Sequence, residues 1–185
     1  MNKAPFLVLA ASSGAGKTTI AKELVRRHKE MVISVSATTR ARRIGEKDGV
    51  DYFFMTQEEF EQNIARNNFV EYEQVHGCYY GTLKQVVEKW SQEGKIVVFD
   101  IDVNGALTIK RLYPNSILIF IKAPSLKELR RRLKDRKSDS ERDIEMRLQR
   151  IDYEQKQSKK FDYIVINKNL AKAVGDIEKI LNMHK

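Results

Sequence analysis

The chain has 185 residues, of which 42% are apolar and 9% aromatic, a composition typical of one globular domain and not of a disordered segment. Its 34 lysines and arginines against 25 acidic residues leave a net charge of +9, which favours a polyanionic partner such as a nucleotide, a nucleic acid or an acidic membrane. The single cysteine, Cys78, excludes an internal disulfide framework, no signal-peptide pattern is found, and the apolar runs are too short to span a bilayer. We therefore expect a soluble, cytoplasmic protein.

Short, continuously apolar runs are typical of strands that are covered on both faces of a sheet. Four such runs occur, at residues 6–10, 96–99, 117–121 and 163–166. Helical patterns separate or follow them, at residues 19–27, 83–92, 103–112, 126–137, 141–157 and 171–183. Buried strands that alternate with helices predict an α/β fold with a parallel sheet.

Two regions interrupt this alternation. Residues 34–82 contain short alternating and aromatic segments, which predict an inserted, small mixed subdomain. Residues 126–153 are highly charged and helical with few large apolar positions, which predicts a lid that opens to solvent. We expect a single domain made of a core (residues 1–33, 83–124 and 158–185), the subdomain (residues 34–82) and the lid (residues 125–157).

Small residues dominate the segment between the first predicted strand and the first predicted helix. Gly16, Lys17 and Thr18 match the end of the phosphate-binding pattern G-x-x-x-x-G-K-[ST], in which Ala11 replaces the first glycine. The backbone N–H groups of such a loop, at a helix N-terminus, bind phosphate, while the lysine reaches the β and γ phosphates. The predicted ATP site consists of Ala11, Ser12, Ser13, Gly14, Ala15, Gly16, Lys17, Thr18 and Thr19.

A Mg²⁺ cofactor is expected next to this loop. The Thr18 hydroxyl is a suitable ligand, and Asp100 ends an apolar strand, where a carboxylate can hold Mg²⁺ directly or through water. Asp102 follows two residues later and is expected to face the same side. Thr18 and Asp100 are therefore the predicted metal site.

Three further segments carry the most specific pattern in the chain. Residues 34–54 read SVSATTRARRIGEKDGVDYFF, residues 69–72 read FVEY and residues 77–82 read GCYYGT. Together with SGAGKT upstream and DID at residues 100–102, they closely resemble the guanylate kinases over essentially the whole chain. The resemblance implies a P-loop NTPase core with a five-stranded parallel sheet flanked by helices, an inserted GMP-binding subdomain and a helical lid. It also implies transfer of the γ-phosphoryl group of ATP to GMP, and to dGMP, with Mg²⁺.

The resemblance also implies roles for individual residues. The GMP phosphate would be held by Arg40, Arg43, Tyr52 and Tyr80. The guanine base would be surrounded by Ser36, Glu71, Thr82 and Asp102. Asn167 would lie near the adenine of ATP. The catalytic groups would be Lys17, Arg40, Arg43 and the lid arginines Arg136 and Arg147.

In the lid, this sequence departs from the family pattern. Asp135 and Lys137 flank Arg136 at positions where the family usually has glycines. Three further arginines precede this segment, and the sequence leaves undecided whether they also contact the ATP phosphates: Arg130, Arg131 and Arg132.

The chemistry of these groups agrees with the implied roles. A guanidinium fork matches two phosphate oxygens, so Arg40 and Arg43 suit a phosphate dianion. Guanine presents N1–H and N2–H₂ donors, which a carboxylate such as Glu71 can accept, whereas the adenine edge reverses this pattern. The acceptor phosphate is largely dianionic at neutral pH, so no general base is required. The histidines (His28, His76 and His184) are accordingly expected to be structural or exposed.

Three other functions stay open at this point. A related small-molecule kinase would share the phosphate loop but not the guanine-binding residues, and a substrate panel distinguishes the two. Guanylate-kinase-like domains of scaffold proteins bind phosphopeptides, but they typically have a degraded phosphate loop, whereas Lys17 and Thr18 are present here. A nucleic-acid binder would fit the charge, but no recognisable binding module occurs. The expected partners are ATP and GMP, with no nucleic acid and no membrane.

Overall fold

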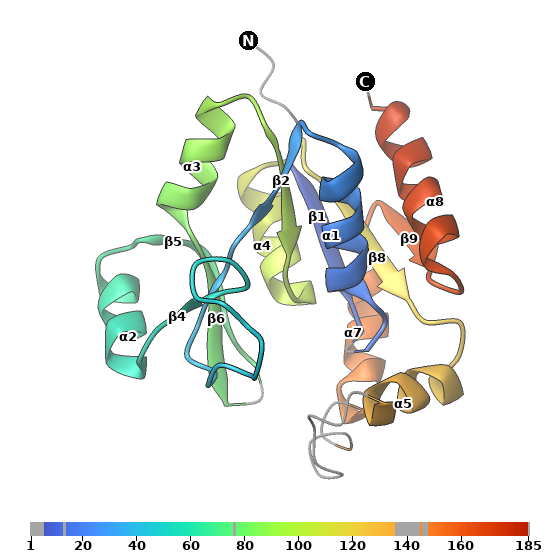
Figure 1. Cartoon of the computed structure of the whole chain (residues 1–185), viewed down its shortest axis with the longest axis horizontal. Coiled ribbons are helices and arrows are strands. Elements are labelled where there is room, and N and C mark those ends of the chain that lie inside the picture. The colour runs from blue at the N-terminus through green and yellow to red at the C-terminus, as the bar shows by residue number, and fades with distance from the viewer. Residues whose placement is uncertain (1–5, 13, 76, 136–144, 146–147, 185) are drawn as a thin grey trace.

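The computed structural model describes residues 6–184, except 13, 76, 136–144, 146 and 147, and contains two sheets with helices packed around them (Figure 1). The larger sheet has five strands in the order β2-β7-β1-β8-β9, and all neighbouring strands run parallel. Its strands are β1 (Leu7–Ala11), β2 (Met31–Ser34), β7 (Ile96–Asp100), β8 (Ile117–Lys122) and β9 (Tyr163–Ile166). The predicted α/β fold with a five-stranded parallel sheet is confirmed.

Alternate side chains of the central strand enter two different cores. Leu7 and Leu9 face one side, where they pack with residues of α1 (Lys17–Arg27) and α8 (Leu170–Asn182). Val8 and Ala10 face the other side, where α3 (Lys84–Gln92) and α4 (Val103–Leu112) contribute to the core. Because both faces are covered, the strands are continuously apolar, which is the signal that the sequence carries.

The smaller sheet lies between β2 and β7 in the chain and has the strand order β4-β3-β6-β5. Its elements are β3 (Ala37–Thr38), β4 (Phe53–Phe54), α2 (Gln57–Ala65), β5 (Phe69–Val75) and β6 (Cys78–Leu83). Phe60 of α2 stacks on Phe69 and Tyr79, with ring centroids 4.3 and 5.2 Å apart, which gives this subdomain a small core of its own. Helix α2 begins at a capping box formed by Thr56 and Glu59.

Helices α5 (Leu126–Asp135) and α7 (Ile151–Ser158) belong to the region predicted as a lid. Leu129 of α5 and Ile151 of α7 are buried in the core cluster on the α1 side of the large sheet, so both helices are anchored to the core. In Figure 1, these helices and the small sheet lie on opposite sides of one end of the large sheet. The helix predicted over residues 141–157 is described as α7 in its second half, whereas residues 141–144, 146 and 147 lie outside the described residues.

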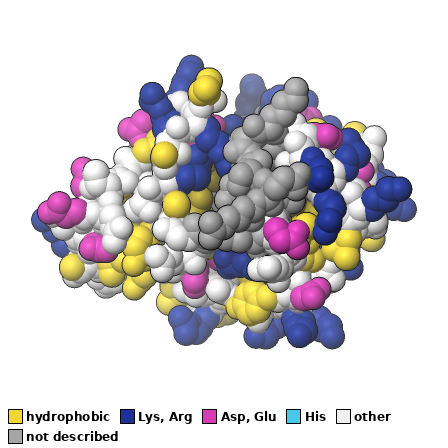
Figure 2. Space-filling model, turned by 90° about the horizontal axis from the view of Figure 1, so that it is seen from below, with side chains coloured by type: hydrophobic (Ala, Val, Ile, Leu, Met, Phe, Trp, Pro, Cys, Tyr) yellow, Lys and Arg dark blue, Asp and Glu magenta, His cyan; other side chains and the backbone are white. Residues whose placement is uncertain are grey.

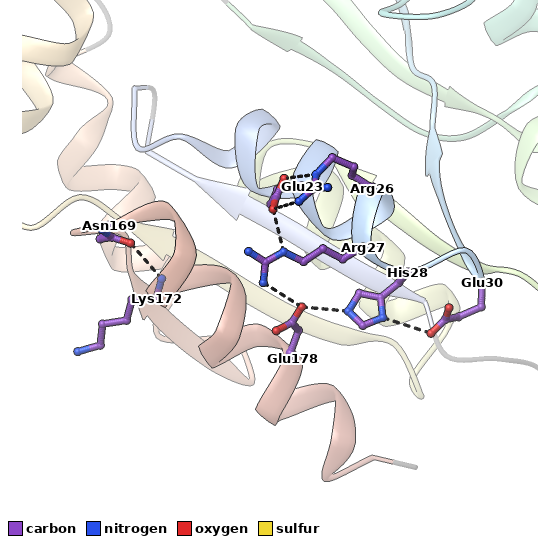
Figure 3. Close-up of polar contacts among 8 residues, drawn as sticks. All are labelled: Glu23, Arg26, Arg27, His28, Glu30, Asn169, Lys172 and Glu178. Carbon is purple, nitrogen blue, oxygen red and sulfur yellow. Dashed lines mark hydrogen bonds and ion pairs between the residues drawn. The ribbon is translucent and has the colours of Figure 1, made fainter.

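The end of α1 remote from the phosphate loop is fixed to α8 by a network of charged side chains (Figure 3). Glu178 of α8 accepts from Arg27 at 3.4 Å and lies 3.1 Å from His28 Nε2. Glu23 accepts from Arg26 and Arg27, whose hydrogen bonds lower the pKa of its carboxyl group to about 2. His28 is therefore in a structural position, as expected from the sequence.

Candidate active site

The carboxyl ends of adjacent parallel strands bring the phosphate loop and the acidic residues together. Leu9 of β1 is in register with Asp100 of β7, so the loop after β1 and residues 100–102 leave the sheet at the same edge. Ligands of open parallel sheets bind at this edge. The sequence led us to expect Asp100 beside this loop, and the other residues of the site lie around the same edge of the sheet.

The loop between β1 and α1 has the backbone conformation of an anion site. Gly14 and Gly16 have positive φ angles of 88° and 92°, which only glycine adopts without strain, and Ala15 N donates to Ser12 O at 3.0 Å. The N-cap residue of α1 is Gly16, which has no side chain to accept from the N–H groups of the first helical turn. Such a turn at a helix N-terminus favours a phosphate group.

Asn167, which follows β9, supports this loop from behind. Its buried Nδ2 donates to Ala15 O at 2.8 Å, and a Cβ added at Gly16 would lie only 2.5 Å from the same nitrogen. Arg132 of α5 donates to Asn167 O at 3.0 Å and thereby lies beside the loop. Of the three arginines that the sequence left open, Arg132 lies beside the predicted phosphate loop in the structure.

Replacing Asn167 by alanine is expected to loosen the phosphate loop. The change removes the 2.8 Å donor to the carbonyl of Ala15 and leaves only the longer bond of 3.4 Å from Arg132 Nη1, which costs about 1 kcal/mol of stability. We expect a lower melting temperature and a raised KM for ATP with little change in the KM for GMP. Thermal unfolding and initial rates at varied ATP test this, and an unchanged KM for ATP would contradict the supporting role.

Lys17 connects the phosphate loop to the end of β7. Its Nζ pairs with Asp100 Oδ1 at 2.6 Å and donates to Ile101 O at 2.6 Å. Thr18, the next residue, lines the same cavity as Asp100. A hydroxyl and a carboxylate beside a phosphate site fit Mg²⁺, which usually takes only one or two protein ligands in addition to phosphate oxygens and water.

A cavity of about 420 Å³ lies between the core and the small sheet. The core contributes Thr18, Lys22, Ile33, Ser34 and Asp100, and the subdomain contributes Ser36, Arg40, Arg43, Glu46, Val50, Asp51, Tyr52 and Tyr80. The cavity therefore joins one edge of the phosphate loop to a cluster of arginine and tyrosine side chains.

Arg40 is held in place by an acid and by aromatic rings. Its Nη2 pairs with Glu46 Oε1 at 2.7 Å, and its guanidinium lies 5.4 Å from the centroid of the Tyr52 ring. Glu46 Oε2 also accepts from the backbone N–H of Arg43 at 2.8 Å, so one carboxylate binds the Arg40 side chain and the backbone of Arg43. Burial raises the pKa of Tyr52, which keeps its hydroxyl a hydrogen-bond donor.

Beyond these residues, a buried carboxylate lies on β5. Thr82 Oγ1 donates to Glu71 Oε1 at 2.6 Å, and both side chains are buried. The pKa of Glu71 is raised to about 7, mainly by burial and also by the negative charges of Asp102 and Glu73. The hydrogen bond from Thr82 acts in the opposite direction. A Cβ added at Gly105 would overlap Glu71 Oε2, so glycine is required where α4 meets this carboxylate.

Asp102 completes this acidic group at the N-terminus of α4. Its Oδ1 accepts from Gly105 N at 2.8 Å as the helix cap, and its Oδ2 accepts from Arg150 at 2.8 Å. The same helix turn therefore positions Asp102 and contacts Glu71.

Comparison with known proteins identifies the family. The sequence profile of the guanylate kinases matches residues 3–184. The chain belongs to the guanylate kinase family. It is 44% identical over 183 residues to the guanylate kinase of Thermotoga maritima, covering 99% of this chain and 88% of that protein. It is 42% identical over 178 residues to the guanylate kinase of Chlorobaculum tepidum, covering 96% of this chain and 91% of that protein. A crystal structure of the guanylate kinase from Anaplasma phagocytophilum matches with a TM-score of 0.81 and 30% identity, covering 99% of this chain and 87% of that chain.

Lys17, Asn167 and the other described residues of the phosphate loop lie together as stated above. The remaining residues expected from the guanylate kinase motifs fall into three groups in the structure. The first lines the cavity and consists of Thr18, Ser36, Arg40, Arg43, Tyr52, Tyr80 and Asp100. The second forms the acidic group beside it and consists of Glu71, Thr82 and Asp102. The third lies outside the described residues and consists of Ser13, Arg136 and Arg147.

Some contacts of this site carried no clear signal in the sequence. Glu46 lies inside the motif at residues 34–54, but the sequence assigned it no role, and only the structure shows that it binds the Arg40 guanidinium and the Arg43 backbone. Lys22 of α1 and Asp51 of the subdomain form an ion pair of 2.8 Å across the cavity, although 29 residues separate them. Only the folded structure brings such pairs together.

Proposed function

We propose that this protein transfers the γ-phosphoryl group of ATP to GMP, with dGMP as a second acceptor, and releases ADP and GDP. The observation that carries the proposal is the cavity that has Thr18 and Asp100 on one side and Arg40, Tyr52 and Tyr80 on the other. A donor phosphate at the loop and an acceptor phosphate at the arginines would meet in this cavity. The guanylate kinase relatives support the same activity.

In this proposal the subdomain, residues 34–82, binds GMP. Arg40 and Arg43 bind the GMP phosphate, helped by the hydroxyl groups of Tyr52 and Tyr80, and Glu46 keeps the Arg40 guanidinium oriented. The guanine base is proposed to lie against Ser36, Glu71, Thr82 and Asp102.

At this recognition edge, the two carboxylates accept from the N1–H and N2–H₂ donors of guanine. The Ser36 hydroxyl group is proposed to donate to O6 of guanine, whereas the Thr82 hydroxyl group donates to Glu71 and holds that carboxylate in place. Adenine would place an acceptor against the buried Glu71, which is the basis of the expected discrimination.

The phosphate loop, residues 11–19, is proposed to bind the ATP phosphates. Lys17 neutralises charge on the phosphoryl group, and the lid, residues 125–157, supplies Arg132 beside the loop. Asn167 close to the adenine, and Arg136 and Arg147 at the phosphates, stay predictions from the family resemblance. When bound at Thr18 and Asp100, Mg²⁺ would neutralise phosphate charge.

The proposed mechanism uses charge and position instead of a protein base. The GMP phosphate is largely dianionic at neutral pH, so it attacks without losing a proton to the protein. Arg40, Arg43 and Lys17 reduce the repulsion between the two anions and stabilise charge on the transferring group. Closure of the subdomain and lid excludes water, which would otherwise compete as the acceptor.

A nucleotide panel tests the proposal. ADP formation is measured with ATP and each of GMP, dGMP, AMP, CMP and UMP as acceptor. We expect a kcat/KM for GMP that exceeds the value for AMP by about 10⁴-fold, as for sites that hydrogen-bond a matching edge. Equal rates with GMP and AMP would contradict the assignment of the guanine site.

The pH dependence of GMP use follows from Glu71. Because the pKa of this group is raised to about 7, its carboxylate is progressively protonated below that pH and can no longer accept from both guanine donors. We expect kcat/KM for GMP to fall by up to about tenfold per pH unit below 7. The phosphate of GMP itself takes up a proton near pH 6, which would also lower kcat/KM. The control is therefore Glu71→Gln, for which the fall of kcat/KM near pH 7 should be absent.

The setting of the enzyme is also a proposal. In the described part of the chain, no helix is long and apolar enough to cross a membrane. We propose that the protein works in the cytoplasm, where its lone Cys78 would stay reduced. On the face shown in Figure 2, described basic and acidic side chains are interspersed, and the lysines and arginines form no single continuous patch there.

A further inference from the structure

Arg150, just before α7, links the lid to the acidic group at the N-terminus of α4. Its Nη2 donates to Asp102 Oδ2 at 2.8 Å, and its Nε lies 3.9 Å from Glu154 Oε1, one helical turn further along. The side chains of Arg150 and Asp102 are about one-fifth exposed (21% and 20%), so this pair is shielded more than a typical surface ion pair. The contact spans 48 residues of sequence, and none of the family motifs quoted above includes Arg150.

The surroundings of Asp102 are strongly acidic. The negative charge of Asp102 raises the pKa of Glu71 and of Glu73, both on β5. It also raises the pKa of Glu154 on α7, which is buried. Among the described residues, Arg150 and Lys17 are the cations that act on these carboxylates, and Lys17 is already paired with Asp100. Within this described part of the chain, Arg150 is the positive side chain that contacts Asp102 directly.

Both oxygens of the Asp102 carboxylate already accept one hydrogen bond. Oδ1 accepts from the backbone of Gly105 as the cap of α4, and Oδ2 accepts from Arg150 and keeps a second lone pair that can accept from a ligand. Glu71 Oε2 contacts the same glycine, so both carboxylates converge on one turn of α4. Two adjacent acceptors match the two adjacent donors of guanine, N1–H and the 2-amino group.

We propose that Arg150 is a positioning residue that aims Asp102 Oδ2 at the 2-amino group of guanine and so sets the preference for GMP over IMP. The inference rests on the proposed function. IMP shares O6 and N1–H with GMP and lacks only the 2-amino group, so Glu71 can still serve it. Arg150 therefore acts on the acceptor base, and not on the transferring phosphoryl group.

The test compares Arg150→Met with Lys156→Met, which removes one exposed positive charge from the same helix. KM and kcat are measured for GMP and for IMP. For Arg150→Met we expect a KM for GMP raised about tenfold, corresponding to a lost charged hydrogen bond, with kcat changed less than about twofold. The parameters for IMP should stay the same, so the GMP/IMP ratio of kcat/KM falls about tenfold. Lys156→Met should leave all values unchanged.

A conservative variant separates positioning from folding. Arg150→Lys keeps the charge but loses the planar fork, and we expect it to recover the ratio to within about threefold of the parent value. If Arg150→Met does not yield folded protein, Arg150→Gln, which also removes the charge, takes its place, and an unchanged GMP/IMP ratio in that variant overturns the proposal.

Other results also decide against Arg150 as a positioning residue. An equal rise in the KM values for GMP and IMP, or a fall in kcat at unchanged KM, would show that it acts on the fold or on phosphoryl transfer. Failure of the parent enzyme to phosphorylate GMP would instead refute the proposed function, and that result is read before any variant is made.

Discussion

Replacing Lys17 by methionine is expected to lower kcat for GMP phosphorylation about 1000-fold or more while the protein stays folded. The ammonium group is the positive charge at the phosphate loop, 2.6 Å from Asp100 and from the carbonyl of Ile101. Methionine keeps the length of the side chain but cannot neutralise charge on the transferring phosphoryl group. The loss should therefore appear in kcat, because the interaction strengthens as charge develops.

The matched control is Lys29→Met, which removes an exposed lysine just beyond the other end of α1. It should retain the parent kcat and KM values. Circular dichroism and thermal unfolding of both variants establish whether the fold is intact. Near-normal turnover by a folded Lys17→Met protein would contradict the role assigned to the phosphate loop.

The second large effect is expected from Glu71→Gln. The amide has nearly the same shape as the carboxylate, but its NH₂ group would face the guanine donors and leave a buried donor unpaired. We expect kcat/KM for GMP to fall about 10²- to 10⁴-fold, with little change for AMP. Steady-state rates with both nucleotides measure this, and an unchanged GMP/AMP ratio would refute the contact between Glu71 and guanine.

The same substitution should stabilise the protein in a defined pH range. The pKa of Glu71 is raised from 4.5 to about 7, so the folded state holds a proton that the unfolded state has released between these values. Stability therefore falls as the pH rises through this window, and the full penalty applies above it. Melting temperatures should show a gain for Glu71→Gln at pH 8 that disappears near pH 4; a gain of equal size at both pH values would contradict the burial argument.

The local patterns in the sequence predict the core of this fold well. The apolar runs at β1, β7, β8 and β9 are covered on both faces, and the small residues before α1 match the phosphate loop. The short strand β2 was not recognised individually, because its four residues, MVIS, give too little periodicity. Its place at the edge of the sheet comes from pairing with β7.

The sequence predicts the site less completely where a residue is positioned by a partner that is distant in the chain. The motifs indicate roles for Arg40 and Arg43 but none for Glu46, which pairs with the Arg40 guanidinium and accepts from the Arg43 backbone. They indicate Asp102, but not Arg150, which lies 48 residues away and depends on how α7 packs on α4. Spacing along the chain carries no information on such pairs, because tertiary packing creates them.

The direct measurement of the central claim is to follow the transferred phosphoryl group. ATP labelled with ³²P at the γ position is incubated with GMP and Mg²⁺, and the nucleotides are separated. We predict that the label appears in the β-phosphate of GDP, with one GDP formed for each ADP and with little inorganic phosphate. Label released mainly as inorganic phosphate, or ADP formed without GDP, would contradict the account.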